Sequence, residues 1–375
     1  MQQTPLGGLS AKEFLRRYWQ KRPLLVRRAL PGFRGVLDRN ALFALAARSD
    51  VESRLVERAG SRWRVTQGPI SGARLARAGK TGWTLLVHGV NHFRAAAERL
   101  LRRFAFVPEA RLDDLMVSYA VPGGGVGPHF DGYDVFLVQG PGRRVWRLER
   151  PRRFALLPGA PLKLIAGFRP EEEFLLEPGD LLYLPPRWGH DGVALDPGFT
   201  CSVGFRAPRG AELAAAFLDY LQERGLPDAE YRDPGLRPAA RPALVGEALA
   251  RYARKQLARI RWRAADEEIF LGRFLSAPRA DTVFALPRRP LARRAFARRL
   301  ARGMVALDPR TRLLYRGRQV FINGEALAPR ETQRRALAAL ADGRRLAGRT
   351  LARAALGDLL YDWYRGGYLR LERST

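Results

Sequence analysis

Between residues 83 and 205 the sequence consists of short apolar runs interrupted at close intervals by glycine and proline, and this pattern constrains the fold more than any other feature. Runs of this length that end at turn residues are typical of β-strands. Many short strands at this spacing favour a sandwich or a barrel, and a jelly roll fits best. The expected strands cover 83–90, 115–121, 134–139, 144–148, 173–176, 180–184 and 199–205.

Helical patterns flank this strand-rich stretch. We expect a helix over 10–18, where Ser10 can cap and Glu13 completes a capping box, and another over 39–47. From about residue 209, apolar residues recur at helical spacing on two faces separated by a long proline-rich loop, so these two helices are expected to lie apart or to pack on another chain. The two faces consist of Leu213, Phe217, Leu218 and Leu221, and of Val245, Leu249, Tyr252 and Leu257.

After a second break over 276–290, the remaining residues predict a small unit of helices and a hairpin, which suggests a winged-helix shape. The chain is therefore expected to be an α+β protein in three parts: a jelly-roll unit over 1–208, a helical segment over 209–290 and a winged-helix-like unit over 291–375. The elements expected in the last part are strands over 313–315, 319–322 and 368–371, and helices over 330–341 and 349–364.

Composition narrows the cellular setting. No apolar run approaches the length of a membrane span, and the single cysteine, Cys201, excludes an intramolecular disulfide. We therefore expect a cytoplasmic protein with no membrane partner.

The formal net charge of +29 is carried almost entirely by arginine, which provides 61 of the 66 basic residues. A GC-rich genome explains arginine in place of lysine, but it does not explain the excess of basic over acidic residues. From residue 276 onward, 22 arginines and no lysine stand against 8 acidic residues, a net charge of +14. Such a surface attracts nucleic acid, although a solvated face left by genome drift stays an equal alternative. The arginine pairs at 288–289, 293–294 and 298–299 recur at a spacing that forms a basic stripe if the segment is helical.

The chemistry-bearing stretch runs from Val121 through Pro-Gly-Gly-Gly-Val-Gly-Pro to His129-Phe-Asp131. In a strand, residues i and i+2 point to the same face, so the imidazole and the carboxylate are expected to converge. A third ligand from elsewhere completes the 2-His-1-carboxylate set that non-haem iron(II) uses. His190 is the natural candidate because it follows a Pro-Gly-Asp turn, an apolar strand and a Pro-Pro pair. His88 and His92 have no neighbouring carboxylate in sequence and are interpreted as ordinary structural residues.

Three stretches resemble the bacterial ribosomal oxygenases, JmjC-type cupin enzymes that hydroxylate the β-carbon of an arginine in large-subunit ribosomal protein L-sixteen. The resemblance covers the whole chain in order, strongly over 111–208 and only loosely beyond 209. It implies a double-stranded β-helix (the cupin/JmjC jelly roll), a helical dimerisation segment and a winged-helix-like end, assembled as a homodimer. The three stretches are Pro122-Gly-Gly-Gly-Val-Gly-Pro-His-Phe-Asp-Gly-Tyr-Asp-Val-Phe136, Gly142-Arg-Arg-Val-Trp-Arg147 and Ser202-Val-Gly-Phe-Arg-Ala-Pro208.

The resemblance also assigns roles. It implies that His129, Asp131 and His190 bind Fe(II), with 2-oxoglutarate as cosubstrate and O2 as oxidant. It places Arg144 opposite the distal carboxylate of 2-oxoglutarate, a role that suits the guanidinium fork, with Ser118 adding a hydroxyl. Arg143 and Arg147 are chemically equal rivals, and strand alternation puts Arg143 on the opposite face. The substrate arginine is expected to meet a carboxylate, an aromatic face and a hydroxyl, from Asp114, Tyr133 and Ser202.

Two alternatives differ in class. One is a non-enzymatic regulator in which the cupin core acts as a sensor and the basic winged helix binds DNA. The other keeps the oxygenase chemistry but directs it to RNA or to another basic protein. For the ribosomal-protein hydroxylase, the basic C-terminal part is expected to contact ribosomal RNA or an assembling ribosomal particle and to hold the enzyme near its protein target.

Overall fold

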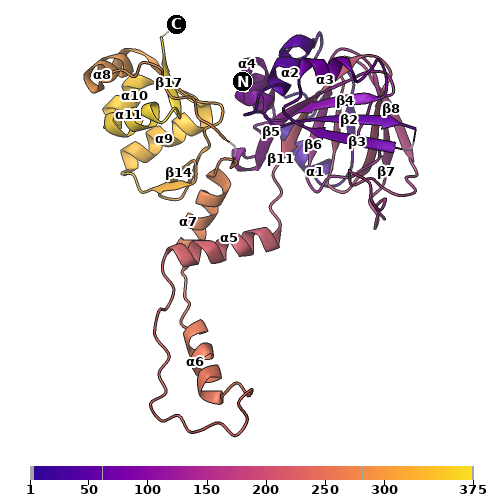
Figure 1. Cartoon of the computed structure of the whole chain (residues 1–375). Coiled ribbons are helices and arrows are strands. Elements are labelled where there is room, and N and C mark those ends of the chain that lie inside the picture. The colour runs from indigo at the N-terminus through magenta and orange to yellow at the C-terminus, as the bar shows by residue number, and fades with distance from the viewer. Residues whose placement is uncertain (1–3, 61, 281, 374–375) are drawn as a thin grey trace.

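The computed structural model describes residues 4–60, 62–280 and 282–373. Two antiparallel sheets in the N-terminal part face each other, which confirms the expected jelly roll (Figure 1). The larger sheet has the spatial order β1 (Leu24–Val26), β9 (Leu181–Leu184), β6 (Val135–Gln139), β11 (Gly198–Phe205), β5 (Leu112–Ala120), β4 (Trp83–Val87), β2 (Ser53–Ala59) and β3 (Arg62–Gln67). The smaller sheet has the order β10 (Gly189–Ala194), β7 (Arg144–Glu149) and β8 (Glu172–Leu176).

Residue alternation along β5 shows how the larger sheet separates core from cavity. Leu115, Val117 and Tyr119 are buried in the main hydrophobic core. Asp114 and Ser118, on the opposite face, line a cavity between the two sheets. The same two-residue period therefore supplies both the packing that holds the sheet and the polar groups that face its partner.

Helices cover the outer face of the larger sheet. The predicted capping box at the start of α1 is present, with Ser10 and Glu13 each accepting the other's backbone N–H. The side chain of Asp38 accepts the N–H of Ala41 and caps α2. The short helical elements of this part are α1 (Ala11–Arg17), α2 (Arg39–Ala46), α3 (Gly72–Ala76), η1 (Val90–His92), α4 (Ala95–Arg102) and η2 (Glu109–Arg111).

The middle part is an extended helical arm. Helices α5 (Gly210–Glu223) and α7 (Ala264–Ser276) meet at its base, and α6 (Glu247–Leu257) projects away from both globular parts (Figure 1). Several apolar residues expected on α5 and α6 are exposed, with Leu218 64% and Leu257 68% exposed, whereas Leu221 is buried and Phe217 packs on Phe270 of α7. No helix in the described part of the chain combines the length and apolarity that crossing a membrane requires.

The C-terminal part has its own core around Phe296, Leu337 and Leu360. The expected hairpin is present, and Asn323 and Gly324 both have positive φ at its second turn. The single helix expected over 349–364 is wrong, because the chain breaks it at Ala355, whose φ is +55°. The elements are α8 (Arg293–Arg302), β12 (Met304–Leu307), β13 (Leu313–Arg316), β14 (Gln319–Ile322), β15 (Glu325–Leu327), α9 (Glu331–Gly343), β16 (Arg345–Ala347), α10 (Gly348–Arg353), α11 (Gly357–Arg365) and β17 (Leu369–Glu372).

The C-terminal part packs on the jelly roll through charged and polar groups. Arg312 donates to the backbone oxygens of Leu112 (3.1 Å) and Asp113 (3.2 Å) at the start of β5. Arg206, at the end of β11, donates to the backbone oxygen of Leu275 in α7 (2.9 Å). In turn, α7 packs on β14, where the ring of Phe321 lies over Gly272. The arm and the C-terminal part are thus anchored close to one end of β5.

Candidate metal centre and its cavity

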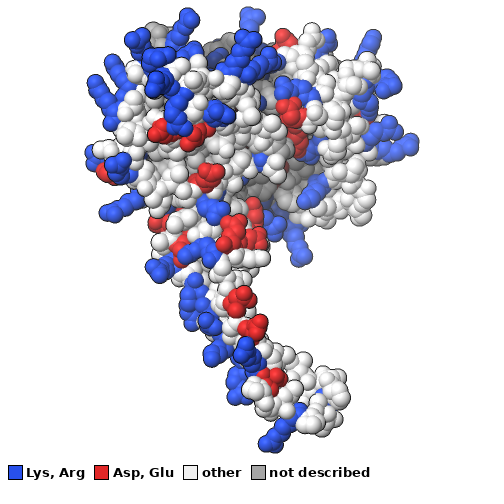
Figure 2. Space-filling view, turned by 60° about the vertical axis from the view of Figure 1, so that its left-hand side comes forward, with Lys and Arg blue, Asp and Glu red and all other residues white. Residues whose placement is uncertain are grey.

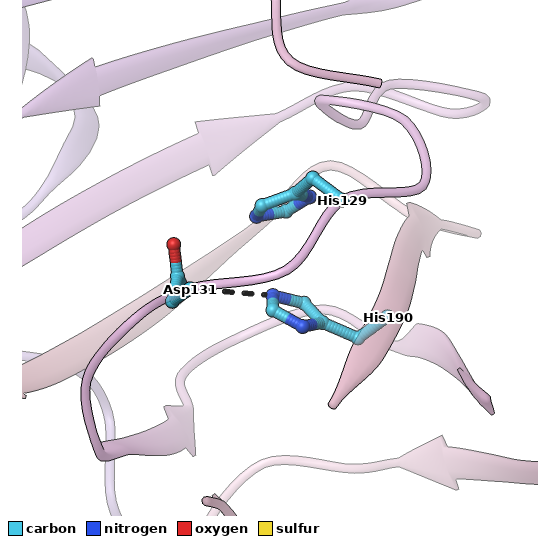
Figure 3. A group of neighbouring side chains, drawn as sticks. All are labelled: His129, Asp131 and His190. Carbon is cyan, nitrogen blue, oxygen red and sulfur yellow. Dashed lines mark ion pairs between the residues drawn. The ribbon is translucent and has the colours of Figure 1, made fainter. Parts of the chain in front are cut away.

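Three side chains converge at one point between the sheets. Ligand-type atoms of His129, Asp131 and His190 all lie within 4.8 Å of one another, and Nε2 of His190 lies 3.7 Å from Oδ2 of Asp131 (Figure 3). His190 comes from β10, whereas His129 and Asp131 come from the loop after the glycine-rich stretch. The expectation that His129 and Asp131 share a strand is wrong, because this loop forms only one isolated bridge.

That bridge is nevertheless what brings the loop to β10. The N–H of His129 donates to the carbonyl of His190 (2.9 Å), and the N–H of His190 donates back to His129 (2.7 Å). Gly127 makes the approach possible: its φ is +79°, and a Cβ there would lie 2.8 Å from the ring of Trp63. Glycine at this position therefore positions the first histidine opposite the second.

Hydrogen bonding selects the tautomer of both histidines. Nδ1 of His129 lies 2.8 Å from the carbonyl of Gly127, and Nδ1 of His190 lies 2.9 Å from that of Trp188. Since a carbonyl can only accept, each Nδ1 carries the proton and each Nε2 keeps its lone pair. Burial and the neighbouring His129 lower the pKa of His190 to about 4, so its ring is neutral at neutral pH. Two neutral imidazoles and one carboxylate fit a divalent transition metal.

The cluster opens into a cavity of about 660 Å³ that extends between the two sheets. Arg144 lies on its wall with 5% of its surface exposed, and its Nη1 donates to Oγ of Ser118 on the facing sheet (3.4 Å). Among the described residues no carboxylate lies within ion-pair distance of Arg144. Burial lowers the pKa of Arg144 to about 10, with Asp191 opposing the shift, so the group stays charged near pH 7. A buried cation without a partner fits a ligand that carries a carboxylate.

The rival arginines lie elsewhere. Arg143 is half-exposed and pairs with Asp196 at 2.7 Å, and Arg147 pairs with Glu173 at 2.7 Å on the outer face of the smaller sheet. Only Arg144 of the three lines the cavity.

The three residues expected at the substrate also line this cavity: Asp114, Tyr133 and Ser202. Asp114 is 6% exposed and accepts the N–H of Gly89 (2.8 Å). Although burial acts in the opposite direction, His88 and Arg279 hold the pKa of Asp114 at about 2. Tyr133 is 41% exposed, so its ring stands at the open side of the cavity.

Sequence reasoning missed several groups at this site. Neither His88 nor His92 joins the metal cluster, but His88 lines the cavity with its Nδ1 3.6 Å from Oδ2 of Asp114. The two-residue alternation along β4 predicts the position of His88, because Thr84 and Leu86 line the same wall of the cavity and His88 is the next residue on that face. Asp191, next to His190, is buried with an Oδ1 that finds no hydrogen-bond partner. Arg279 lines the cavity although it is distant in sequence from the other lining residues, and no local sequence pattern predicts this position.

Comparison with known proteins agrees with this geometry. Residues 99–213 match the JmjC domain family, and residues 260–370 match the ROXA-like winged helix family. The chain is 38% identical over 321 residues to the ribosomal protein uL16 3-hydroxylase of Escherichia coli (strain K12), covering 85% of this chain and 86% of that protein. It is also 38% identical over 205 residues to a probable ribosomal oxygenase of Haemophilus influenzae, covering 53% of this chain and 50% of that protein.

Solved structures show the same relationship. The X-ray structure of E. coli ycfD matches with a TM-score of 0.85 at 35% identity, covering 97% of this chain and 99% of that one. YcfD, a ribosomal oxygenase from E. coli, in complex with cobalt and 2-oxoglutarate matches with a TM-score of 0.82 at 36% identity over the same shares. The jelly roll and its His-Asp-His cluster thus define a JmjC-type cupin oxygenase. Identity of 38% over 85% of the chain then specifies the kind: the chain belongs to the ribosomal oxygenase family.

Proposed function

We propose that this protein is an Fe(II)- and 2-oxoglutarate-dependent oxygenase that hydroxylates the β-carbon of an arginine in a large-subunit ribosomal protein of the uL16 (L-sixteen) type. The observation that carries the proposal is the cavity that joins the His-Asp-His cluster to an unpaired, buried arginine. The relative's name, ribosomal protein uL16 3-hydroxylase, supports the choice of target. Such a target places the reaction in the cytoplasm, where bacterial ribosomes assemble.

In this proposal His129, Asp131 and His190 hold the metal. The Nδ1–H of each histidine is fixed by a backbone carbonyl, so each ring offers Nε2 without reorienting. Three protein ligands on one face leave positions open for cosubstrate and O2. When bound, iron and 2-oxoglutarate supply the oxygen activation that hydroxylation of an unreactive carbon requires.

Arg144 and Ser118 bind the distal carboxylate of 2-oxoglutarate. Arg144 brings a charge that has no acidic partner in the described cavity, and Ser118 brings a hydroxyl within 3.4 Å of it. Because they lie on facing sheets, they hold the cosubstrate across the jelly roll. The wall between the sheets is apolar around Trp146 and Leu137, which excludes water from the reacting end.

Asp114, Tyr133 and Ser202 receive the substrate arginine. The low pKa of Asp114 keeps its carboxylate ionised at neutral pH, as pairing with a guanidinium requires. Tyr133 stands at the exposed side and can stack on the same group. Ser202, on β11 beside β5, adds a hydroxyl close to Asp114 along the same wall.

A mass-spectrometric experiment tests the proposal. Ribosomal proteins are incubated with the protein, Fe(II), 2-oxoglutarate and O2, and each is measured for the mass gain of one oxygen atom. We expect the gain on an arginine of one large-subunit protein and none with an Asp131→Ala variant. Oxygen added only to RNA, or to a basic protein outside the ribosome, would reassign the substrate. No turnover of 2-oxoglutarate with any substrate would contradict the enzyme.

We further propose that residues 209–290 form a homodimerisation segment between a catalytic unit over 1–208 and a winged-helix-like unit over 291–375. The support is the uncovered apolar surface of the arm, including Leu218 on α5 and Leu249 on α6. Such surface is stable in water when a second copy covers it. Light scattering is expected to give twice the mass of the chain, and Leu249→Asp to shift it toward one chain. A single-chain mass for the unaltered protein at micromolar concentration contradicts the proposal.

Finally, we propose that the C-terminal unit contacts ribosomal RNA or an assembling ribosomal particle through a basic face on α8 and the adjoining α10. Figure 2 brings this unit forward and shows basic side chains crowding its upper edge. The stripe is shorter than the arginine spacing suggested, because α8 begins at Arg293 and the pair at 288–289 precedes it. In α8, Arg293 pairs with Asp358, and it is not counted in the face. The basic face consists of exposed Arg294, Arg298, Arg299, Arg349 and Arg353, none of which has an acidic partner among the described residues.

A further inference from the structure

The acidic end of the catalytic cavity already holds an arginine of this chain. Glu52, Asp113 and Asp114 supply three carboxylates there, and Arg279 lies among them. Its Nη2 is 2.8 Å from Oδ2 of Asp113 and 3.9 Å from Oδ2 of Asp114, and its Nη1 is 3.5 Å from Oε2 of Glu52. Arg279 belongs to the stretch between α7 and α8, outside the jelly roll.

Two of the three carboxylates have further arginine partners. Asp113 also meets Arg312 (3.5 Å) and Arg206 (3.9 Å). Glu52 also pairs with Arg54 (3.2 Å). Asp113 and Glu52 therefore each keep an arginine partner for their negative charge when Arg279 moves away.

Asp114 is different. Its remaining contacts are the N–H of Gly89 at 2.8 Å and the imidazole of His88 at 3.6 Å. Among the described ion pairs, the guanidinium that approaches this carboxylate is that of Arg279. Asp114 is also the acid that the proposed function assigns to the substrate arginine, so two guanidinium groups are directed to one buried carboxylate.

We propose that Arg279 is a resident guanidinium that competes with the incoming substrate arginine for Asp114 and that the substrate arginine displaces. The inference rests on the proposed function. Two like charges on one buried carboxylate repel each other, so the substrate side chain and Arg279 compete for it. A side chain that lacks a guanidinium cannot replace the charge and the forked hydrogen bonds of Arg279, so it leaves Arg279 on Asp114.

The surroundings of Arg279 suit displacement. Its side chain is 33% exposed, so the guanidinium can move into water without crossing the core. The described residues around it, 277–280 and 282–292, lie in neither helix nor strand. Its departure leaves Asp113 and Glu52 paired, so the only carboxylate released is Asp114. Exchange of one guanidinium for another thus leaves all three carboxylates paired before and after substrate binding.

The test compares Arg279→Ala with Arg54→Ala, a matched control that removes the same charge from the cavity wall but not from Asp114. The substrate is a peptide around the arginine identified by mass spectrometry. For Arg279→Ala we expect KM to fall about two- to fivefold, the range for a partly exposed ion pair, with kcat unchanged. Direct calorimetry without O2 should show the same gain in affinity, and a smaller gain for the peptide with citrulline in place of arginine, which has no charge to offer Asp114.

Three results overturn the inference. They are an unchanged or higher KM for Arg279→Ala, an equal fall in KM for Arg54→Ala, and an equal gain for the citrulline peptide. Failure of the proposed function looks different, because the unaltered protein then hydroxylates no ribosomal peptide while still folding normally. Hydrogen exchange adds an independent readout: binding of the arginine peptide should speed exchange at Ala277 and Ala280, and binding of the citrulline peptide should not.

Discussion

The catalytic cavity and the basic face both hold arginines that have no acidic partner in the described part of the chain, but their surroundings are opposite. In the cavity, Arg144 is 5% exposed and contacts the Ser118 hydroxyl and the Trp146 ring. On the basic face, Arg298 and Arg299 stand in water. A buried unpaired charge requires one partner of matching shape, whereas an exposed one is screened by salt and accepts any anion. Substitutions in the cavity should therefore have large, specific effects, and those on the face small, additive ones.

The largest effect should follow removal of a metal-binding carboxylate. Asp131→Ala removes a ligand without removing core volume, so the fold should persist while 2-oxoglutarate turnover falls at least about 100-fold, beyond the loss typical of a group that only supports a ligand. Asp196→Ala, which removes an exposed carboxylate paired with Arg143, is the control and should retain turnover. Full turnover by iron-loaded Asp131→Ala would remove this residue from the metal site.

Arg144 should come next. Arg144→Ala deprives a buried carboxylate of its partner, which corresponds to about 2–5 kcal/mol and should raise the KM for 2-oxoglutarate accordingly. Arg144→Lys should retain part of the activity, because lysine keeps the positive charge although it lacks the two parallel hydrogen bonds of a guanidinium. Arg143→Ala, which breaks an exposed pair, is the matched control. A larger effect from Arg143 would mean that the cosubstrate is bound from the other face of the strand.

The basic face should respond more weakly and only through salt. In an RNA-binding assay, Arg298→Gln with Arg299→Gln should lower the slope of log affinity against log salt by about 1 to 2, since each phosphate contact contributes about 0.7–0.9. The matched control is Arg334→Gln with Arg335→Gln on α9, which changes the charge equally but removes arginines already paired with Glu331. Equal slopes for the two double variants would identify the face as a solvated surface.

The junction between the two regions should show the smallest effect, and only in acid. Burial lowers the pKa of His92 to about 4, against 6.5 for an exposed histidine. Below about pH 6.5 His92 is protonated in the unfolded chain, whereas in the folded protein it stays neutral until about pH 4. The free energy of unfolding should therefore fall by about 1–3 kcal/mol as the pH is lowered through that window. Urea unfolding of the unaltered protein and of His92→Gln measures the difference. An identical pH dependence in both would assign the acid sensitivity to other groups.

Local patterns predicted the parts of the molecule that local forces build. The capping box at Ser10 and the seven apolar runs correspond to elements of the structure, within a few residues. The convergence of His129 and Asp131 was predicted from strand geometry that the loop does not have. It holds because a bridge to His190 orients the loop in the same way.

The remainder depends on contacts between distant residues. β2 and β3 were missed because their arginines and glutamates mask the alternation of Leu55 and Val65. The break at Ala355, where φ is +55°, was missed because alanine favours helix, and the local sequence therefore predicts that the helix continues. Arg279 was missed because 165 residues separate it from Asp114, and the sequence around it contains no motif that predicts a place in the cavity.

Arg279, from the stretch that connects α7 and α8, reaches the mouth of the cavity. Substrate affinity and oxygen chemistry therefore depend on residues in different parts of the chain, which can change separately in evolution. The metal-binding residues lie in the jelly roll, on β10 and on the loop that bridges to it. Arg279 lies on the stretch between α7 and α8, outside the two sheets that enclose the metal site. Gene duplicates can therefore change their affinity for a target while keeping their chemistry, and the connecting stretch is the first place to compare among relatives.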